Sequence, residues 1–160
     1  MSEKILYIDP QKCIGCKRCE LICSQYHEEK YQPLLSRIRV LLFEDIGLGI
    51  PTACSDCRVM VCQDVCPSGA IRGNTVGATI IEERCVGCKQ CIFVCPFGGA
   101  GFNEGKGVAL KCDLCDGDPQ CVIDCPTDAL QFIDIDRAVM NKKRDHIKEI
   151  ILEKMGGQDE

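Results

Sequence analysis

The sequence predicts a small α+β fold, as one compact domain or two small lobes, in which short strands and short helices alternate with groups of cysteine. Three observations lead to this expectation. Cysteine accounts for 16 of the 160 residues. Short apolar runs with turn residues at their ends separate the cysteine groups. The last part of the chain, residues 137–155, has apolar residues at helical spacing.

Five short strands are expected, each from an apolar run bounded by turn-forming residues. They cover residues 4–9, 38–43, 69–72, 78–82 and 128–134. The turn-like pair Gly73-Asn74 lies between the third and fourth runs, so these two runs predict a hairpin. A later glycine cluster, Gly98, Gly99 and Gly101, predicts a mobile loop.

Short helices are expected to run from the third to the fourth cysteine of a group, for example over residues 17–25 and 90–94. Residues 137–155 predict a longer C-terminal helix that packs on the body of the protein through one apolar side. The apolar residues on that side are Val139, Ile147, Ile150 and Ile151. Residues 156–160 are expected to form a frayed tail.

The cysteines do not predict a secreted disulfide framework. The first apolar run, residues 5–8, is short and is followed by Asp9-Pro10, so it does not resemble the core of a signal peptide. No apolar run approaches the roughly 18 residues of a membrane span. A reducing, cytoplasmic compartment with the cysteines held by metal is therefore the preferred interpretation.

The cysteines form four complete groups of four. The groups are Cys13, Cys16, Cys19, Cys23; Cys54, Cys57, Cys62, Cys66; Cys85, Cys88, Cys91, Cys95; and Cys112, Cys115, Cys121, Cys125. Groups one and three read C-x2-C-x2-C-x3-C, and the other two widen only the middle gap. Pro67, Pro96 and Pro126 follow the last cysteines of groups two, three and four. In such runs three close cysteines hold one [4Fe–4S] cluster and the fourth binds the other cluster of a pair.

Other residues of the groups agree with this chemistry. Gly15 and Gly87 are expected to let the backbone approach a cluster closely, and Ile14 and Val86 to exclude water from it. Zinc is the main alternative, but structural zinc sites use paired C-x2-C knuckles, usually together with histidine. His27 and His146 are the only histidines, and both lie outside the groups, so we expect them at the surface.

Linker lengths leave the pairing of the groups open. Residues 67–84 make a short connection between groups two and three, whereas residues 24–53 between groups one and two are longer. A nested scheme pairs two with three inside a unit made by one and four. A tandem scheme pairs one with two and three with four, and spacing alone is compatible with both.

The chain resembles the iron–sulfur subunits of molybdenum and tungsten pterin oxidoreductases. The resemblance covers residues 4–136 and is carried by residues 12–16 with Cys19 and Cys23, by residues 36–38, and by two segments near the C-terminus, 111–115 and 121–130. It implies two ferredoxin-like 2[4Fe–4S] folds in a pseudo-symmetric arrangement. The compact links are most similar to the small electron-transfer subunit of tungsten-containing aldehyde oxidoreductases. Related small proteins serve hydrogenases and carbon monoxide dehydrogenase.

The same resemblance implies four nested ligand sets. These sets are Cys13, Cys16, Cys19, Cys125; Cys23, Cys112, Cys115, Cys121; Cys54, Cys57, Cys62, Cys95; and Cys66, Cys85, Cys88, Cys91. The implied inner unit covers about 54–95, and the outer unit covers about 4–23 plus 112–136. Met60-Val61 stands where many relatives have proline, which leaves the path of that loop open.

Complete cysteine quartets argue against a catalytic centre on this chain, because a reactive cluster needs an iron without a protein thiolate. We expect instead an electron-transfer subunit of a hetero-oligomer, which joins a catalytic oxidoreductase subunit to another redox partner. The preferred catalytic subunit is an aldehyde oxidoreductase of the tungsten or molybdenum pterin type. A free polyferredoxin and a structural zinc-binding interaction module are the alternatives. No phosphate loop or dinucleotide fingerprint is present.

Charge excludes nucleic acid as a partner. The chain carries a formal charge of −5. Each oxidised cluster with four thiolates adds −2, so four clusters give about −13. Lys17, Arg18 and Lys89 stand beside cluster cysteines and are candidates to offset that charge, while residues 142–144 are expected to form a solvated helix face.

Overall fold

A computed structural model describes residues 4–55, 57, 59–73 and 78–156. Within these residues eight strands form four separate two-stranded antiparallel sheets. The strands are β1 Lys4–Ile8, β2 Arg39–Phe43, β3 Leu48–Thr52, β4 Ile71–Gly73, β5 Ala78–Ile80, β6 Ala100–Asn103, β7 Val108–Lys111 and β8 Leu130–Asp134. The pairs are β1 with β8, β2 with β3, β4 with β5 and β6 with β7.

The helices are short except for the first and the last. They are α1 Arg18–Glu28, α2 Val61–Asp64, α3 Gln90–Phe93, α4 Gln120–Ile123 and α5 Ile135–Gly156. Single 3-10 turns precede the first cysteines of groups one and three, at Pro10–Lys12 and Glu82–Arg84. The other 3-10 turns are Pro33–Leu35 and Leu114–Gly117.

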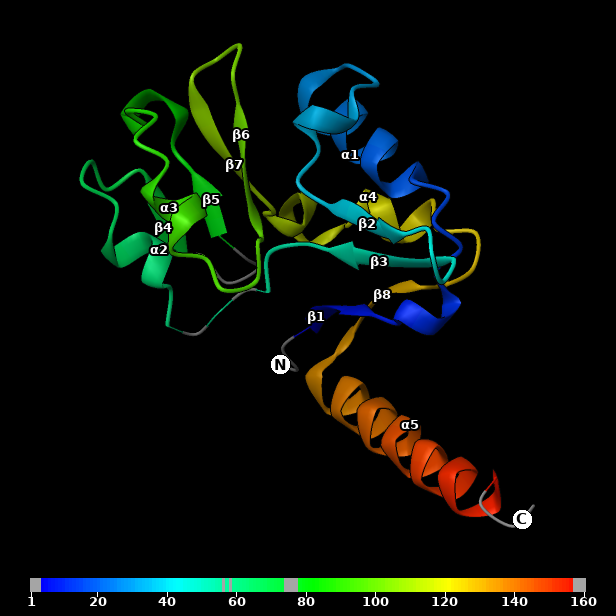
Figure 1. Ribbon diagram of the computed structural model, residues 1–160. Helices are drawn as coiled ribbons and strands as arrows, with labels where there is room; N and C mark the ends of the chain where they lie inside the picture. The colour runs from blue at the N-terminus through cyan, green and yellow to red at the C-terminus, as the bar shows by residue number, and fades with distance from the viewer. Residues whose placement is uncertain (1–3, 56, 58, 74–77, 157–160) are drawn as a thin grey trace.

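The elements gather into two parts that are interleaved in sequence (Figure 1). The outer unit contains β1, α1, β2, β3, α4 and β8, and the inner unit contains α2, β4, β5, α3, β6 and β7. In the outer unit β1 pairs with β8 over its whole length, from Lys4 opposite Asp134 to Ile8 opposite Leu130, and α1 packs on α4. In the inner unit β4 pairs with β5 and α2 packs on α3.

Cysteine side chains form part of the hydrophobic core in both units. In the outer unit Cys19, Cys23 and Cys121 are buried together with Ile38 and Leu130. In the inner unit Cys91 is buried between Ile71 and Ala109, with three further half-buried cysteines packed around it. Apolar residues therefore pack against cysteine side chains in both units.

The strands expected at residues 4–9, 38–43, 69–72, 78–82 and 128–134 are all present, within one or two residues at each end. The turn of the expected hairpin and the end of the expected tail lie outside the described residues. Strands β3, β6 and β7 were not expected. The prediction of a mobile glycine loop is wrong, because Gly101 lies in β6 and Gly99 is buried against the backbone of Cys54.

The C-terminal helix is confirmed, but its packing was predicted wrongly. α5 touches the body as far as Asp145: Ala138 is buried with Tyr7 and Ile133, and Tyr7 OH donates to Asp145 Oδ2 at 3.3 Å. Beyond that point α5 projects away from both units (Figure 1). The apolar side that was expected to pack is exposed at Val139, Ile147, Ile150 and Ile151.

Candidate iron–sulfur cluster sites

Three small cavities are each lined by four cysteine side chains. The cysteine sets are Cys13, Cys16, Cys19, Cys125 in the first, Cys66, Cys85, Cys88, Cys91 in the second, and Cys54, Cys57, Cys62, Cys95 in the third. Each set joins the first three cysteines of one group to the last cysteine of another. Groups one and four meet in this way in the outer unit, and groups two and three meet in the inner unit.

The remaining four cysteines lie near one another in the outer unit. Burial raises the pKa of Cys112 to about 12 and that of Cys115 to about 11, and in both cases the nearby Cys23 adds to the effect. Burial also raises the pKa of Cys121, with Cys112, Cys23 and Cys115 as the largest charged contributors. Thiols with raised pKa values stay protonated at neutral pH when no metal is bound. A metal ligand has to be a thiolate, so metal binding at these cysteines releases their protons.

Backbone N–H groups are directed at several of the sulfur atoms. Arg37 N donates to Cys23 Sγ at 3.2 Å, Ala70 N to Cys66 Sγ at 3.3 Å, Gly99 N to Cys95 Sγ at 3.3 Å and Ala109 N to Cys85 Sγ at 3.4 Å. Burial would raise the pKa of Cys125, but N–H donors from Leu130, Thr127 and Ala129 outweigh it, and the pKa lies below its ordinary value. Donors of this kind stabilise thiolate, the form that binds iron.

Groups one and three have the same backbone path. The glycine of each Cys-x-Gly-Cys run has a left-handed φ, +68° at Gly15 and +66° at Gly87, and so has the lysine two residues later. A Cβ on Gly87 would lie 2.6 Å from the carbonyl oxygen of Gly107, so only glycine allows this approach. Ile14 and Val86 line the cavities as expected, although both also remain largely exposed to solvent.

His27 is not a surface residue, which corrects the expectation from the sequence. Its side chain is only 10% exposed, and its Nε2 lies 3.7 Å from Cys115 Sγ and 3.5 Å from Asp113 Oδ1. Burial, and next the charge of Arg37, lower the pKa of His27, which favours the neutral imidazole. His146, in contrast, is exposed on α5 as predicted.

Lys111 was not recognised as part of a site from the sequence. It is 8% exposed, it lines the cavity of the Cys54 set, and its Nζ lies 2.6 Å from Cys54 Sγ. Burial alone would lower the pKa of Lys111, but the hydrogen bond to Cys54 and the charges of Cys54, Cys62 and Cys95 raise it overall. The only signal in the sequence was its position directly before Cys112.

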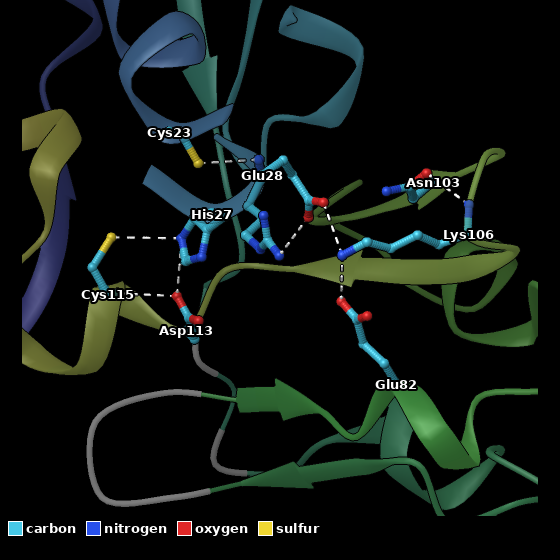
Figure 2. A network of polar contacts seen from close by, with 9 residues as sticks. Cys23, His27, Glu28, Glu82, Asn103, Lys106, Asp113 and Cys115 are labelled. Atoms are coloured by element: carbon cyan, nitrogen blue, oxygen red, sulfur yellow. Dashed lines mark hydrogen bonds and ion pairs between the residues drawn. The ribbon is translucent and has the colours of Figure 1, made fainter. Parts of the chain in front are cut away.

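A partly buried polar network connects the two units (Figure 2). Glu28, the last residue of α1, accepts a hydrogen bond from Arg37 Nη2 at 3.1 Å and pairs with Lys106 Nζ at 2.9 Å. Lys106 lies between β6 and β7 and also reaches Glu82 at 3.2 Å. The backbone of Arg37 in turn donates to Cys23, so the network runs from a cysteine of the outer unit to the inner unit.

The charged residues beside the cysteines have other partners as well. Arg18 forms a bidentate pair with Asp124, at 2.7 and 3.1 Å, which joins α1 to the end of α4. Lys89 Nζ lies 4.1 Å from the ring centre of Phe102 and 3.6 Å from Glu104. These contacts fix helices next to the cysteine groups, in addition to any effect on cluster charge.

Among the described residues, no helix is both long and apolar enough to cross a membrane.

Known protein families match the chain over all four cysteine groups. Residues 47–135 match the 4Fe-4S dicluster domain, and residues 6–24 match the 4Fe-4S binding domain. The electron transport protein HydN of Escherichia coli is 36% identical over 157 residues, covering 82% of this chain and 88% of that protein. The polyferredoxin-like subunit of the aliphatic sulfonate oxidoreductase of Pyrococcus furiosus is 38% identical over 144 residues, covering 83% and 82%.

A solved structure resembles the fold. It is the active-site complex BamBC of benzoyl coenzyme A reductase with 1,5-dienoyl-CoA, in which one chain superimposes with a TM-score of 0.50 and 28% identity. The match covers 81% of this chain and 75% of that chain.

Two interlocked units, each built around cysteine quartets with N–H donors to sulfur, define an iron–sulfur electron-transfer protein. The chain belongs to the 4Fe-4S dicluster family of ferredoxin-type proteins. It binds [4Fe–4S] clusters through its cysteines, and its role is that of an electron-carrying subunit rather than an enzyme in its own right.

Proposed function

We propose that the chain holds four [4Fe–4S] clusters in the nested arrangement, with all sixteen cysteines as ligands. The observation that carries this proposal is the lining of three cavities, because each combines three cysteines of one group with the fourth of its partner group. The fourth set, Cys23, Cys112, Cys115 and Cys121, is supported by the mutual effects of these residues on their pKa values. When bound, each cluster accepts and releases one electron.

The four sites follow one another along a single path. The Cys13 set and the Cys23 set share the core of the outer unit, and the Cys54 set and the Cys66 set share that of the inner unit. The two units meet where Cys54 lies close enough to Cys112 to raise its pKa. Of the sixteen cysteines only Cys16 and Cys88 are exposed, and they belong to the sets at the two ends of the path.

We propose that electrons enter at one end and leave at the other, between a catalytic oxidoreductase subunit and a second redox partner. The similarity to a polyferredoxin-like subunit of a sulfonate oxidoreductase and to a chain of a benzoyl coenzyme A reductase complex supports a catalytic partner. The resemblance of the cysteine segments to subunits of pterin oxidoreductases makes a tungsten or molybdenum enzyme the preferred type of partner. The acidic holoprotein suits partners with basic rims. Sixteen thiolate ligands suit a reducing cytoplasm.

A free electron carrier is the second candidate, because HydN is described as an electron transport protein and not as a subunit. Purification from the native host distinguishes the two. A catalytic subunit that co-purifies in fixed stoichiometry supports the subunit role, and a monomeric iron–sulfur protein in all fractions supports the free carrier.

Metal analysis of the anaerobically prepared protein tests the cofactor count. Four clusters predict about 16 iron and about 16 acid-labile sulfide per chain. About four zinc without sulfide would refute the cluster assignment and would favour a structural zinc module, since four sites of four cysteines bind one zinc each.

Double substitution tests the nested sets. If Cys13 and Cys125 bind the same cluster, the double variant Cys13→Ala with Cys125→Ala alters the signal of only one cluster. Each single variant alters the signal of that same cluster. Cys85→Ala combined with Cys125→Ala then alters two signals. The tandem scheme predicts the reverse, because it places Cys125 with group three. Electron paramagnetic resonance of the reduced protein, together with its iron content, counts the altered clusters.

A further inference from the structure

Lys111 is a buried cation at the junction of the two units. It ends β7, whose four residues are all buried, and its side chain lines the cavity of the Cys54 set. Its Nζ lies 2.6 Å from Cys54 Sγ. Among the described residues no carboxylate forms an ion pair with Lys111, so a cysteine sulfur is the partner of this ammonium group.

The corresponding positions of the other groups are different. The residues directly before the first cysteines are Lys12, Ala53 and Arg84. Lys12 is exposed and pairs with Asp9 at 3.6 Å, Arg84 is exposed, and Ala53 has no charge. Lys111 alone of these four positions therefore places a buried positive charge beside a cysteine quartet.

The position of Lys111 also relates it to two adjacent sites. Its side chain faces the Cys54 set, while its backbone continues directly into Cys112 of the neighbouring set. An electron that crosses from one unit to the other passes between these two sites. A charge fixed at this point acts on the step that joins the units.

The physical effect has a definite sign. Reduction adds one negative charge to a cluster, and a cation a few ångströms away in a medium of low dielectric constant stabilises the reduced form. Hydrogen bonds to the sulfurs and local charge are among the factors that set cluster potentials. We propose that Lys111 raises the reduction potential of the cluster held by Cys54, Cys57, Cys62 and Cys95, so that an electron resides preferentially at the junction of the two units. This inference rests on the ligand sets of the proposed function.

Redox titration of the anaerobic holoprotein, followed by electron paramagnetic resonance, tests the proposal. In Lys111→Met, the equilibrium constant for reduction of one cluster is expected to fall at least tenfold, which is about 59 mV for a one-electron couple. Lys111→Arg retains the charge and is expected to stay within threefold of the wild type. Lys12→Met is the matched control, because it removes a lysine from the same position of group one, and it is expected to leave all potentials unchanged.

The outcomes separate this inference from the proposed function. A wild-type protein with far fewer than four clusters would contradict the proposed function. A Lys111→Met protein with full iron and sulfide content and unchanged potentials would overturn only the role of Lys111. If Lys111→Met does not load its clusters, Lys111→Gln, which keeps a donor for Cys54 but no charge, takes its place with the same expected fall. If neither variant binds its clusters, Lys111 has a structural role, and that result would also overturn the proposal.

Discussion

The substitution Glu28→Gln tests whether the polar network of Figure 2 holds the two units together. Glu28 binds Arg37 of the outer unit and Lys106 of the inner unit, and its side chain is 5% exposed. Glutamine keeps the shape of the side chain but removes the charge. It leaves the guanidinium of Arg37, itself 11% exposed, without its anionic partner. Arg37 Nη1 is already buried without a hydrogen-bond partner among the described residues.

The expected loss of stability follows from these contacts. Removing one partner of a buried ion pair costs about 3–5 kcal/mol of stability. Because Lys106 is partly exposed, we expect Glu28→Gln to lose about 3 kcal/mol. For a chain of this length that corresponds to a midpoint lower by about 6–12 °C. The assay is anaerobic thermal denaturation of the holoprotein, followed by the visible absorption of the clusters.

The matched control is Glu82→Gln, which removes the other carboxylate bound to Lys106. Glu82 is 43% exposed, so its loss is expected to cost no more than about 1 kcal/mol. The reasoning is refuted if Glu28→Gln lowers the midpoint no more than Glu82→Gln. Lys106 and Arg37 lower the pKa of Glu28 despite its burial. The contribution of the Glu28 carboxylate to stability is thus fully present above the ordinary pKa of glutamate and is lost only as the pH falls below that value. The difference in stability between wild type and Glu28→Gln is therefore constant from about pH 6 to 8.

Three further predictions concern local features of the fold. Gly87→Ala is expected to cost about 2 kcal/mol or more and to lower the iron content, because the new Cβ meets Gly107 at a left-handed φ. Gly47→Ala, at a similar φ with no atom within 4 Å, is expected to cost only about 1 kcal/mol. Glu20→Ala is expected to cost about 1–3 kcal/mol, since the buried Glu20 accepts the N–H of Val40 at 2.7 Å, whereas Glu20→Gln retains an acceptor. A chain that ends at residue 146 is expected to keep its iron and its midpoint, because Ile147, Ile150, Ile151 and Leu152 are all exposed.

Each of these predictions has an opposing result in the same thermal and metal assays. Equal effects of Gly87→Ala and Gly47→Ala would show that contact with Gly107 is unimportant. Equal losses in Glu20→Ala and Glu20→Gln would mean that the charge of Glu20, and not its acceptor oxygen, is what matters. Loss of iron from the shortened chain would show that the last turns of α5 cover the body of the protein.

The cysteine groups were predictable because the constraint on them is local. Three ligands at x2 intervals lie on one loop, so their spacing is set by the geometry of the bound group and can be read from a short stretch of sequence. The glycines of groups one and three follow the same logic, since a left-handed φ is a property of one residue. The nested arrangement, in contrast, remained open, because linker length restricts the distance between groups but not their choice of partner.

Features that depend on distant packing were missed. Strand β3 contains Gly49 and Pro51, residues that are poor signals for a strand but are tolerated at an edge. Lysine is usually exposed and histidine is intermediate in burial, so nothing local indicated that Lys111 and His27 are buried beside sulfur atoms. The periodicity of α5 predicted a helix correctly, but periodicity does not say which surface an apolar side contacts.

The pairing of β1 with β8 has a consequence for biosynthesis. Ile8 pairs with Leu130, so β1 has no partner until β8 has been made. At about 5–20 residues per second, that wait is on the order of ten seconds. The hairpin of β4 and β5, whose strands are close in sequence, closes far sooner. We therefore expect the β4–β5 hairpin to form while β1 still lacks its partner, and the proposed Cys13 set to be complete only after translation has passed Cys125.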